Sequence, residues 1–416
     1  MEHLPGFREF FPEPIPSGEA WSAAVREHLF ERWHAVARRY GFQLYDGPPV
    51  EPLELYTAKS GAEIAGQLYH FTDKGGREVS LRPEMTPTVA RMVAARERHY
   101  KKPLKWYSIP QLFRYERQQK GRLREHFQLN ADIFGETNTA ADAELIALLI
   151  DLLRAFGLSS EDFVIRLSSR NVWQDFYRRH GNSPDRAYDF FQVVDKLERN
   201  DPAQSDATLR ELGLSLEAVR AFIAQGAPTV ELQAVLDNLA ARGLAEFVRV
   251  DYTVIRGLAY YTGIVYEAFD RHGKFRAIAG GGRYDELVTL VSGGRSNVPA
   301  AGFAIGDVVL TELLKERGKL PAIGERLDAY LMIEDESRRG ESLSLLQRLR
   351  DAGMVVDFSL TPAKPDKQFK RAQEAGAAFT LALDAQLRVR VRHLATREEA
   401  ILPHEGVETH LRSKLA

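Results

Sequence analysis

The chain has 416 residues, a formal net charge of -2 and no cysteine, and its length predicts two or three domains with ample material for a core. Because the charge is balanced, the molecule as a whole does not attract nucleic acid electrostatically, and any such contact has to come from local basic patches. The lack of cysteine excludes disulfides, thiolate metal sites and cysteine nucleophiles. The sequence shows no signal-like or membrane-length apolar run, which predicts a soluble cytoplasmic protein with no membrane partner, and we assign no metal ligands.

The first regular element follows a Pro-rich N-terminal stretch. Apolar residues recur at helical spacing from residue 19 to Gly41, which predicts a long amphipathic helix that stops at this glycine. The next stretch, FQLYDGPPVEPLELY, is strand-like but is broken by Pro48, Pro49 and Pro52. Because proline cannot donate to a strand ladder, this pattern indicates an edge or interface strand.

The stretch LYHFTDKGGREVSLRPEMTPTVARMVAARE predicts a hairpin that turns at Gly75-Gly76, then a strand and a helix from about Pro87. Glu84 and Thr86 fall in the turn between strand and helix, where a carboxylate and a hydroxyl can be aimed into a pocket. Thr86 would also suit a helix cap with Pro87 at the first helical position. The two roles are compatible.

Residues 105–135 predict two strands joined by a long basic loop. Alternation places Arg114 and Glu116 on one face of the first strand, and Gln128 and Asp132 on the polar face of the second. A half-buried sheet with many polar groups on one face usually forms the floor of a ligand site, because buried polar groups need partners. The loop RQQKGRLREH suits phosphates or a nucleic-acid end. Each charge alone would fit a solvated hairpin, whereas the joint spacing favours a site.

Residues 136–160 and 170–245 are mostly helical in period and are separated by the strand FVIRLSS, which predicts a small helical subdomain. Residues 248–270, VRVDYTVIRGLAYYTGIVYEAFD, predict a strand that is interrupted at Arg256 and Gly257. A glycine there allows a ligand to approach the backbone closely.

The run Gly280–Gly282 before Arg283 predicts a turn rather than the interior of an element, with the backbone packed against another group; a flexible loop is the alternative. NVPAAGFAIGDVVLTELLKERG then predicts a strand followed by a helix. After Pro321 strands alternate with helices up to the C-terminus, which predicts a separate small α/β domain at residues 326–416.

Four separated motifs resemble the histidyl-tRNA synthetase family of class II aminoacyl-tRNA synthetases: LRPEMTP, FRYER with its basic loop and HFQLNADIFG, RGLAYYTG, and GFAIG. The resemblance implies an α+β catalytic domain at residues 1–320, with an antiparallel sheet of class II type and a helical insertion at about 170–245 that approaches the tRNA acceptor arm. The KQFKRA helix and its neighbours resemble the family's anticodon-binding domain, at residues 326–416.

The resemblance implies ATP-dependent ligation of L-histidine to tRNA(His) through histidyl-adenylate, with ATP and Mg²⁺ as cofactors. Mg²⁺ would neutralise phosphate charge. It also implies a homodimer through residues 19–56, where an edge strand interrupted by proline suits an interface.

Positions in the motifs assign the site residues. Arg114 and Arg256 are the expected catalytic cations at the α-phosphate, where charge develops in the transition state. Further ATP contacts are expected from Glu116, Arg122 and Arg283. Histidine contacts are expected from Glu84, Thr86, Gln128, Asp132, Tyr260 and Tyr261. The tRNA acceptor end is expected at Arg117 and Gln119. The family usually has Glu where Asp132 stands, so this pocket has a carboxylate shorter by one methylene.

Two departures from the family pattern leave alternatives open. Ala259 replaces the usual Asp of the RGLDYYTG signature, and Val309 stands where the motif 3 pattern has the arginine that contacts the γ-phosphate. Either Arg283 or other cations replace that arginine, or the chain is a weakened relative. The alternative function is the regulatory subunit of ATP phosphoribosyltransferase in histidine biosynthesis, which the retained motif 2 and C-terminal domain disfavour. RGLAYYTG disfavours a class II enzyme for another amino acid. Arg256 would have a purely structural role if it only paired with Asp251 or Glu267.

Overall fold

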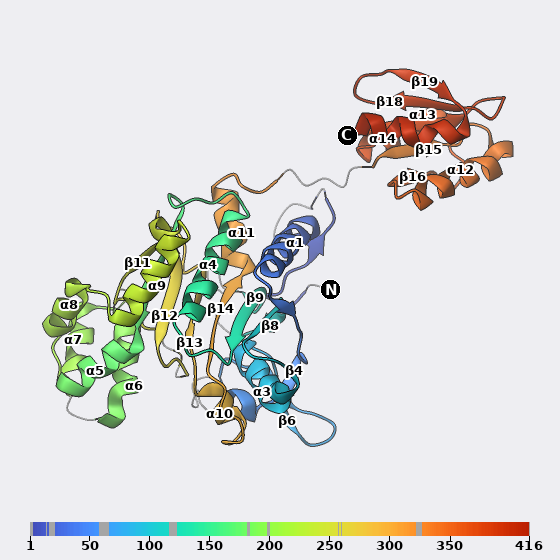
Figure 1. Cartoon of the computed structure of the whole chain (residues 1–416). Coiled ribbons are helices and arrows are strands. Elements are labelled where there is room, and N and C mark those ends of the chain that lie inside the picture. The colour runs from blue at the N-terminus through green and yellow to red at the C-terminus, as the bar shows by residue number, and fades with distance from the viewer. Residues whose placement is uncertain are drawn as a thin grey trace. The chain divides into compact units, whose positions relative to one another are not determined.

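The computed structural model describes residues 3–13, 15, 21–57, 66–115, 123–180, 184–197, 200–256, 258, 260–321 and 327–415. The chain divides into two compact units (Figure 1). One unit comprises Met1–Phe10 and Ser17–Pro321, and the other comprises Phe11–Pro16 and Ala322–Ala416.

In its described residues, the first unit is built on a nine-stranded sheet of order β11-β10-β12-β13-β14-β9-β7-β3, with β8 also paired to β9. Its described neighbours are antiparallel apart from the parallel pairs β10–β11 and β3–β7. The predicted antiparallel sheet of class II type is therefore confirmed. The strands are β3 (Gln43–Leu44), β7 (Leu104–Ser108), β8 (Gln111–Phe113), β9 (Glu125–Phe134), β10 (Phe163–Ser169), β11 (Val248–Val250), β12 (Ile264–Asp270), β13 (Ala279–Arg283) and β14 (Ala300–Gly306).

Helices cover one face of this sheet more fully than the other (Figure 1). On the first face Leu129, Ala131 and Ile133 of β9 join the main core, with α1 (Ala23–Arg39), α4 (Ala140–Arg154) and α11 (Asp307–Glu316) above them. On the second face a smaller core joins the sheet to α3 (Thr86–Arg96) and α10 (Leu287–Val291). The remainder of the second face is left for polar side chains.

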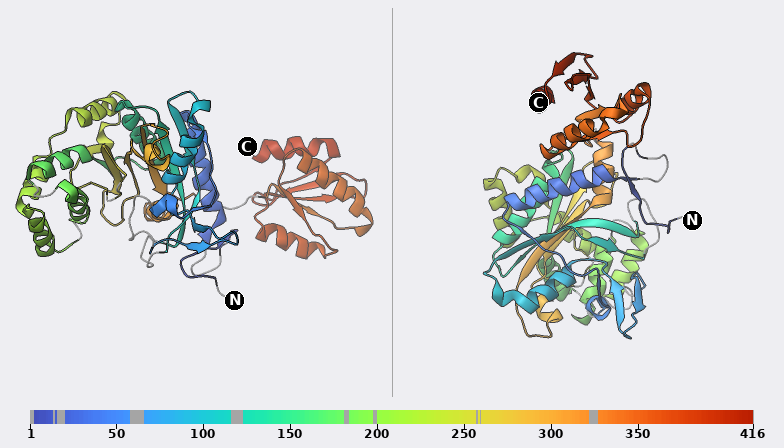
Figure 2. Two further views of the ribbon diagram at one scale, coloured as in Figure 1. Left: turned by 90° about the horizontal axis from the view of Figure 1, so that it is seen from below. Right: turned by 90° about the vertical axis from the view of Figure 1, so that its right-hand side faces the viewer.

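The predicted helical insertion follows β10 and is confirmed. It contains α5 (Arg170–His180), α6 (Ala187–Asp195), α7 (Pro202–Glu211), α8 (Leu216–Gln225) and α9 (Val230–Ala241). Trp173 of α5 organises its core, with ring contacts to Phe176, Phe190 and Phe222 at 5.6, 5.6 and 4.7 Å. Helices α5 to α8 lie at one end of the sheet and α1 lies toward the other (Figures 1 and 2).

The predicted N-terminal helix and hairpin are confirmed, with the helix beginning at Ala23, whereas the strand predicted after Gly41 is divided into β3 and β4 (Val50–Pro52) of two different sheets. Ser22 caps α1 by accepting from the Val25 N–H at 3.2 Å, and the helix ends just before Gly41, whose φ is 76°. Strands β5 (His70–Thr72) and β6 (Glu78–Leu81) form the predicted hairpin, and β4 joins them as an edge strand. In the described sheet β3 and β11 are the two edge strands. A further short pair joins β1 (Phe10–Phe11) to β2 (Trp21–Ser22).

Two strand predictions need correction. The first half of residues 105–135 forms two strands instead of one, because Pro110 separates β7 from β8, and both pair with β9. Arg256 does not interrupt a strand. Strand β11 ends at Val250 and β12 begins at Ile264, so Arg256 lies in the link between them. We call residues 251–263 the β11–β12 link.

The second unit has a sheet of order β16-β15-β17-β18-β19 with its own apolar core. The predicted alternation of strands and helices is present, with β19 as an additional strand that the sequence did not predict. The elements are β15 (Ala329–Met332), α12 (Arg339–Asp351), β16 (Val356–Phe358), α13 (Pro365–Glu374), β17 (Phe379–Leu383), β18 (Val389–His393), β19 (Glu399–Leu402) and α14 (Val407–Leu415). Short 3-10 turns across the chain are Glu97–His99, Pro184–Arg186, Ala245–Phe247, Glu336–Arg338 and His404–Gly406.

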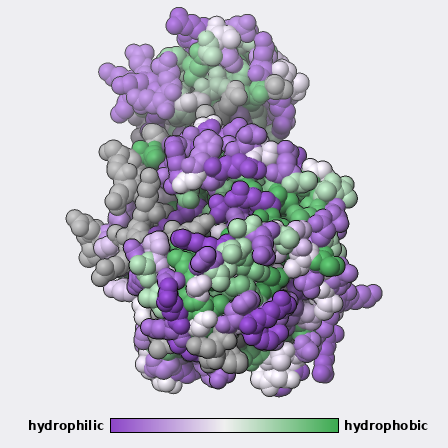
Figure 3. Space-filling model, turned by 90° about the vertical axis from the view of Figure 1, so that its left-hand side faces the viewer, coloured by the Kyte–Doolittle hydropathy of each residue, from purple (hydrophilic) through white to green (hydrophobic). Residues whose placement is uncertain are grey.

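Within the described part of the chain, every helix is too short or too polar to cross a membrane. On the face drawn in Figure 3, hydrophilic side chains are widespread and hydrophobic patches lie among them.

Candidate active site

The polar face of the large sheet carries charged groups on both sides of a strip of small residues. Asp132 of β9 pairs with Gly302 of β14, which pairs with Gly282 of β13. Two residues before Gly282 in β13, and on the same face, Gly280 pairs with Glu267 of β12. The centre of the face is therefore backbone with almost no side chain, between the carboxylates of Asp132 and Glu267. The polar row on β9 consists of His126, Gln128, Asn130 and Asp132.

The glycines allow two functional side chains to lie directly against the strands. A Cβ on Gly280 would fall 1.9 Å from Nη1 of Arg256, and a Cβ on Gly302 would fall 2.1 Å from Oδ1 of Asp132. The predicted turn at Gly280–Gly282 is wrong, because these residues are the buried interior of β13. The expectation that the backbone packs against another group is confirmed, and at Gly280 this group is the Arg256 guanidinium.

Arg256 combines an ion pair with an unusual backbone. Its φ is 58°, and its Nη1 donates to Oε1 of Glu267 at 2.5 Å. Its Nη2 lies 3.5 Å from the Tyr261 hydroxyl. Burial lowers the pKa of Arg256, but Tyr261 and Glu267 outweigh this and raise it above the ordinary value, so the guanidinium stays charged. The ion pair considered as a structural alternative is thus formed with Glu267, while Asp251 pairs with Arg249.

Glu84 lies between β6 and α3, as the sequence predicted, and Thr86 is the first residue of α3. The Tyr260 hydroxyl donates to Oε2 of Glu84 at 2.9 Å. Burial raises the pKa of Glu84, and the cation Arg114 opposes that rise. Thr86 does not cap α3: the N-cap residue is Met85, and no side chain makes a capping hydrogen bond. The hydroxyl of Thr86 is therefore not committed to that local role.

Arg114 follows β8 and is held at its base, because its Nε donates to the Pro83 carbonyl at 2.9 Å and its N–H donates to the Arg124 carbonyl at 2.9 Å. His126 of the polar row was not predicted, although strict alternation with Gln128 points to it. Burial lowers the pKa of His126 to about 3, helped by Arg114, so this ring is neutral. The predicted residues Glu116, Arg117, Gln119 and Arg122 lie outside the described residues.

Asp132 presents an unused acceptor. Its Oδ1 accepts from the Tyr284 hydroxyl, whereas its Oδ2 is buried without a hydrogen-bond partner in the described structure. The side chain is 3% exposed, and burial raises its pKa to about 7 against the opposing effect of Tyr284. Sequence reasoning missed Tyr284, although it has the same strand parity as Gly280 and Gly282. A ligand that donates a hydrogen bond would satisfy Oδ2.

Arg283 lies on the opposite, helix-covered side. Its guanidinium is 8% exposed and forms an ion pair with Asp142 of α4, which is fully buried. It also donates to the carbonyls of Glu136 at 2.9 Å and Asn138 at 3.3 Å. This full set of partners does not fit the predicted ATP contact, because strand parity turns Arg283 away from the polar face. We leave it out of the proposed ATP site.

Val309 packs partly buried against the main core from α11. At the start of that helix Asp307 binds Nη1 of Arg8 at 2.8 Å, and Nε of Arg8 binds Glu125 at 2.6 Å. Burial raises the pKa of Asp307 to about 6, and Arg8 opposes that rise. This buried triad, which the sequence did not predict, ties the N-terminal segment to β9 and to the region where motif 3 was expected.

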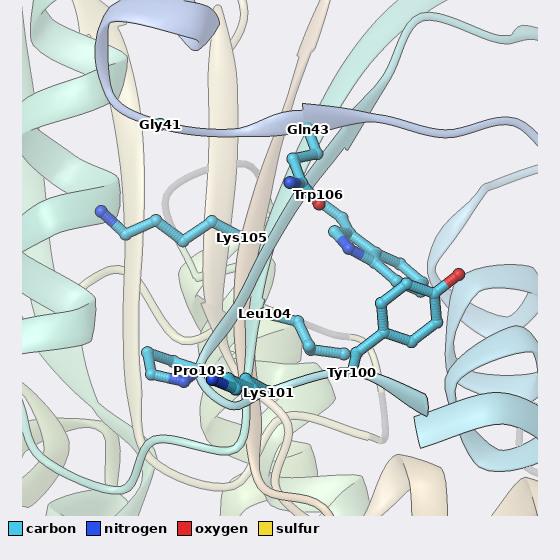
Figure 4. Close-up of a pocket in the computed structure, with 8 residues that line it drawn as sticks. All are labelled: Gly41, Gln43, Tyr100, Lys101, Pro103, Leu104, Lys105 and Trp106. Atoms are coloured by element: carbon cyan, nitrogen blue, oxygen red, sulfur yellow. The ribbon is translucent and has the colours of Figure 1, made fainter. Parts of the chain in front are cut away.

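A hollow of about 310 Å³ lies at the β3 edge of the large sheet. It is beside β3 and β7, where Lys105 and Trp106 point to opposite sides (Figure 4). Tyr100 packs edge-on against Trp106 at 5.1 Å between ring centroids. Its lining residues are Gly41, Gln43, Tyr100, Lys101, Pro103, Leu104, Lys105 and Trp106.

The comparisons with known proteins bear on both units. The family model described as histidyl-tRNA synthetase matches residues 20–307, and the model described as anticodon binding domain matches residues 329–414. A histidine–tRNA ligase of Opitutus terrae is 45% identical over 99% of this chain and 98% of its own length. A chloroplastic/mitochondrial histidine–tRNA ligase of Arabidopsis thaliana is 37% identical over 89% of this chain and 78% of its own.

The fold agrees with these matches. The crystal structure of histidyl-tRNA synthetase from Nostoc sp. PCC 7120 superposes with a TM-score of 0.77 and 22% identity, covering 97% of this chain and all of the other. The second unit accordingly has the fold of an anticodon-binding domain, and the first has the class II catalytic fold. By the extent of the family match and the identity to the ligase of Opitutus terrae, the chain belongs to the histidyl-tRNA synthetase family.

Proposed function

We propose that this chain ligates L-histidine to tRNA(His) in the cytoplasm, first forming histidyl-adenylate from ATP and then transferring the histidyl group to tRNA. Besides family membership, one observation carries the proposal. Arg256, Tyr260 with Glu84, and the unsatisfied carboxylate oxygen of Asp132 all lie on the polar face, where Gly280 and Gly302 leave room for Arg256 and Asp132.

The histidine site is proposed around two carboxylates. Glu84, held by Tyr260, would accept from the substrate ammonium, and Oδ2 of Asp132 would accept from an imidazole N–H. The Asp132 assignment pairs a buried acceptor that has no partner among the described residues with a donor that a ligand would supply. Thr86, Gln128 and Tyr261 complete the proposed set.

The phosphate site is proposed at Arg114 and Arg256. Two fixed guanidinium groups would offset the charge that develops when the histidine carboxylate attacks the α-phosphorus and pyrophosphate leaves. Glu116 and Arg122 remain assigned to ATP by the resemblance. Among the described residues no group of three or more acidic or histidine side chains is placed to hold a metal ion, so Mg²⁺ would be held mainly by ATP phosphates, whose charge it neutralises.

An ATP–pyrophosphate exchange assay with a panel of amino acids tests the first step. We expect exchange with histidine and with no other amino acid at a comparable rate. Exchange driven by a different amino acid would contradict the proposed specificity.

A regulatory subunit of ATP phosphoribosyltransferase is the second candidate, favoured only by Val309 and Ala259. The ligases of 45% and 37% identity over most of the chain weigh against it. The same assay separates the two functions, because a regulatory subunit would support no exchange with any amino acid.

The second unit is proposed to bind the anticodon arm, as residues 326–416. A hollow of about 360 Å³ there is lined by Phe369 and by Arg390 and Arg392, which pair with Glu334 and Glu399; the ring and the guanidinium planes could stack on unpaired RNA bases. Removing residues 326–416 should leave adenylate formation largely intact and impair tRNA charging. Normal charging by the folded truncated protein would refute this assignment.

A homodimer through residues 19–56 is also proposed. Among the described residues β3 pairs only with β7 and leaves its other edge open, Leu44 on it is 57% exposed, and the hollow of Figure 4 lies beside it. Sedimentation at micromolar concentration should give a dimer. A monomer under those conditions would contradict the proposal.

A further inference from the structure

Arg256 has a backbone that needs external support. A φ of 58° is uncommon for a residue with a Cβ and is kept only where the surrounding structure enforces it. The residue lies in the β11–β12 link, whose described residues belong to no strand. The groups that hold this link therefore decide where the guanidinium of Arg256 lies.

One side chain binds the backbone both at Arg256 and at Leu258. Nη1 of Arg170, the first residue of α5, donates to the carbonyl of Arg256 at 2.8 Å and to the carbonyl of Leu258 at 3.1 Å. The N–H of Arg170 donates to the carbonyl of Gly263 at 2.9 Å, at the far end of the link. One residue of the helical insertion thus fixes the link at three carbonyls.

The same helix also holds the start of the link. Nε1 of Trp173 donates to the carbonyl of Tyr252 at 3.1 Å, and the Tyr252 hydroxyl donates to the carbonyl of Ala227, which follows α8, at 2.8 Å. Trp173 is fully buried in the aromatic core of the insertion. Helix α5 therefore cannot shift without moving the link.

Stability alone does not explain a buried arginine at position 170. It is 5% exposed and its guanidinium stacks 4.3 Å from the Phe191 ring, and burial lowers its pKa to about 10. A buried cation has a large desolvation penalty, so an apolar side chain would fill the same space with less penalty. What an apolar side chain lacks is the pair of hydrogen bonds to the Arg256 segment.

We propose that Arg170 is a positioning residue for Arg256, because it fixes the backbone that carries the phosphate-binding guanidinium. Adenylate formation then depends on the position of the helical insertion relative to the sheet. This inference rests on the proposed function. Arg170 touches no reacting atom in this scheme and acts through Arg256.

Arg170→Ala should lower kcat for histidine-dependent exchange by about tenfold to a hundredfold with little change in KM, because Arg256 acts in the transition state. Arg170→Lys should recover part of the rate, since one amine can reach one carbonyl. In the Arg256→Ala background, Arg170→Ala should change kcat by less than about twofold, because the residue it positions is gone. Independent, multiplied losses in the double variant would overturn the proposal.

Amide hydrogen exchange gives a readout that needs no activity. Peptides covering residues 252–262 should exchange at least about tenfold faster in Arg170→Ala than in the wild type, because the link loses its support. If the wild type failed to activate histidine, the proposed function would fall, and this measurement would still decide whether Arg170 holds the link. Unchanged exchange there would overturn the inference.

Arg271 provides a matched control. Its guanidinium also donates to backbone carbonyls, those of Phe163 and Glu246. Arg271 acts at the opposite end of β10, because Phe163 is the first residue of that strand whereas Arg170 comes directly after its last residue. Arg271→Ala should lower the melting temperature without changing kcat or exchange in residues 252–262. Equal losses of kcat in the Arg271 and Arg170 variants would mean that both act through general stability.

Discussion

Two arginine–carboxylate pairs on opposite faces of one sheet show how the fold separates structural from chemical use of the same groups. On the helix-covered face, Arg283 and Asp142 are 8% and 0% exposed, and Arg283 also donates to the Glu136 and Asn138 carbonyls and to the Asp285 carboxylate. On the polar face, Arg256 and Glu267 keep 20% and 21% of their side chains exposed. The first pair is sealed, whereas the second remains open to a ligand.

The difference comes from strand parity and from glycine. Arg283 directly follows the glycine run of β13, so alternation turns it toward α4. Arg256 comes from outside the sheet and lies over Gly280. Each pair should therefore fail in a different way when its arginine is removed.

The largest effect is expected from Arg283→Ala. The buried Asp142 would lose its partner, which should lower the free energy of unfolding by roughly 3–5 kcal/mol. Urea unfolding at pH 7 measures this loss. Arg283→Met combined with Asp142→Leu should recover most of the stability, because two apolar side chains need no partner. A loss below about 1 kcal/mol for Arg283→Ala would show that the pair is not sealed.

Arg256→Ala should act on rate instead. Loss of one preorganised cation should raise the barrier to adenylate formation by roughly 3–4 kcal/mol, about 10² to 10³ in rate. Thermal stability should change far less, because Glu267 keeps access to water. Arg256→Lys should rescue only part, since the planar fork is lost. Histidine activation near the wild-type rate in Arg256→Ala would return Arg256 to a structural role.

Neighbouring glycines of β13 allow the same substitution on both faces. Gly281→Ala would place a Cβ 2.4 Å from the Gly302 carbonyl oxygen, and this backbone cannot yield easily, so unfolding free energy should fall by roughly 1–3 kcal/mol. Gly280→Ala would meet Nη1 of Arg256 at 1.9 Å, the end of a flexible side chain. Its stability should change by less than about 1 kcal/mol, while the displaced guanidinium lowers exchange about tenfold. Equal effects of the two substitutions would contradict the assignment of faces.

The glycine run also shows where sequence reasoning stopped. Periodicity and turn residues predicted α1, the β5–β6 hairpin and the elements after Pro321 other than β19, because those signals are local. Alternation on β9 predicted that Gln128 and Asp132 share a face. The freedom of Gly280–Gly282 was visible in the sequence, but the arginine that covers Gly280 comes from a distant link.

The sequence also did not show which residues each charged side chain would pair with in the fold. Arg283 was predicted as a phosphate cation, because a single sequence does not show that α4 places Asp142 beneath it. Arg8, Tyr284 and Arg170 were missed because their partners are far along the chain. Such contacts follow from the register of β9, β13 and β14, which alternation alone does not fix.

The smallest predicted effect concerns Asp132, the buried carboxylate of the polar face. Its pKa is raised to about 7, so it is mostly protonated at pH 6 and mostly ionised at pH 8. An ionised Oδ2 accepts an imidazole N–H better than a neutral acid does. The KM for histidine should therefore fall by up to about tenfold between pH 6 and pH 8, in exchange kinetics at saturating ATP.

Free histidine also titrates near this range, so the wild-type profile alone is not decisive. Asp132→Asn keeps the shape of the side chain but cannot ionise, so the ratio of its KM to that of the wild type should rise as the pH passes through 7.

The pH dependence of the free energy of unfolding gives an independent test of the same pKa. Because the pKa of Asp132 in the folded chain exceeds the ordinary 3.8, its contribution is complete below pH 4 and is lost as pH rises toward about 7. Wild type should thus lose stability relative to Asp132→Asn over that window, and parallel curves for the two proteins would show that Asp132 is already ionised at low pH.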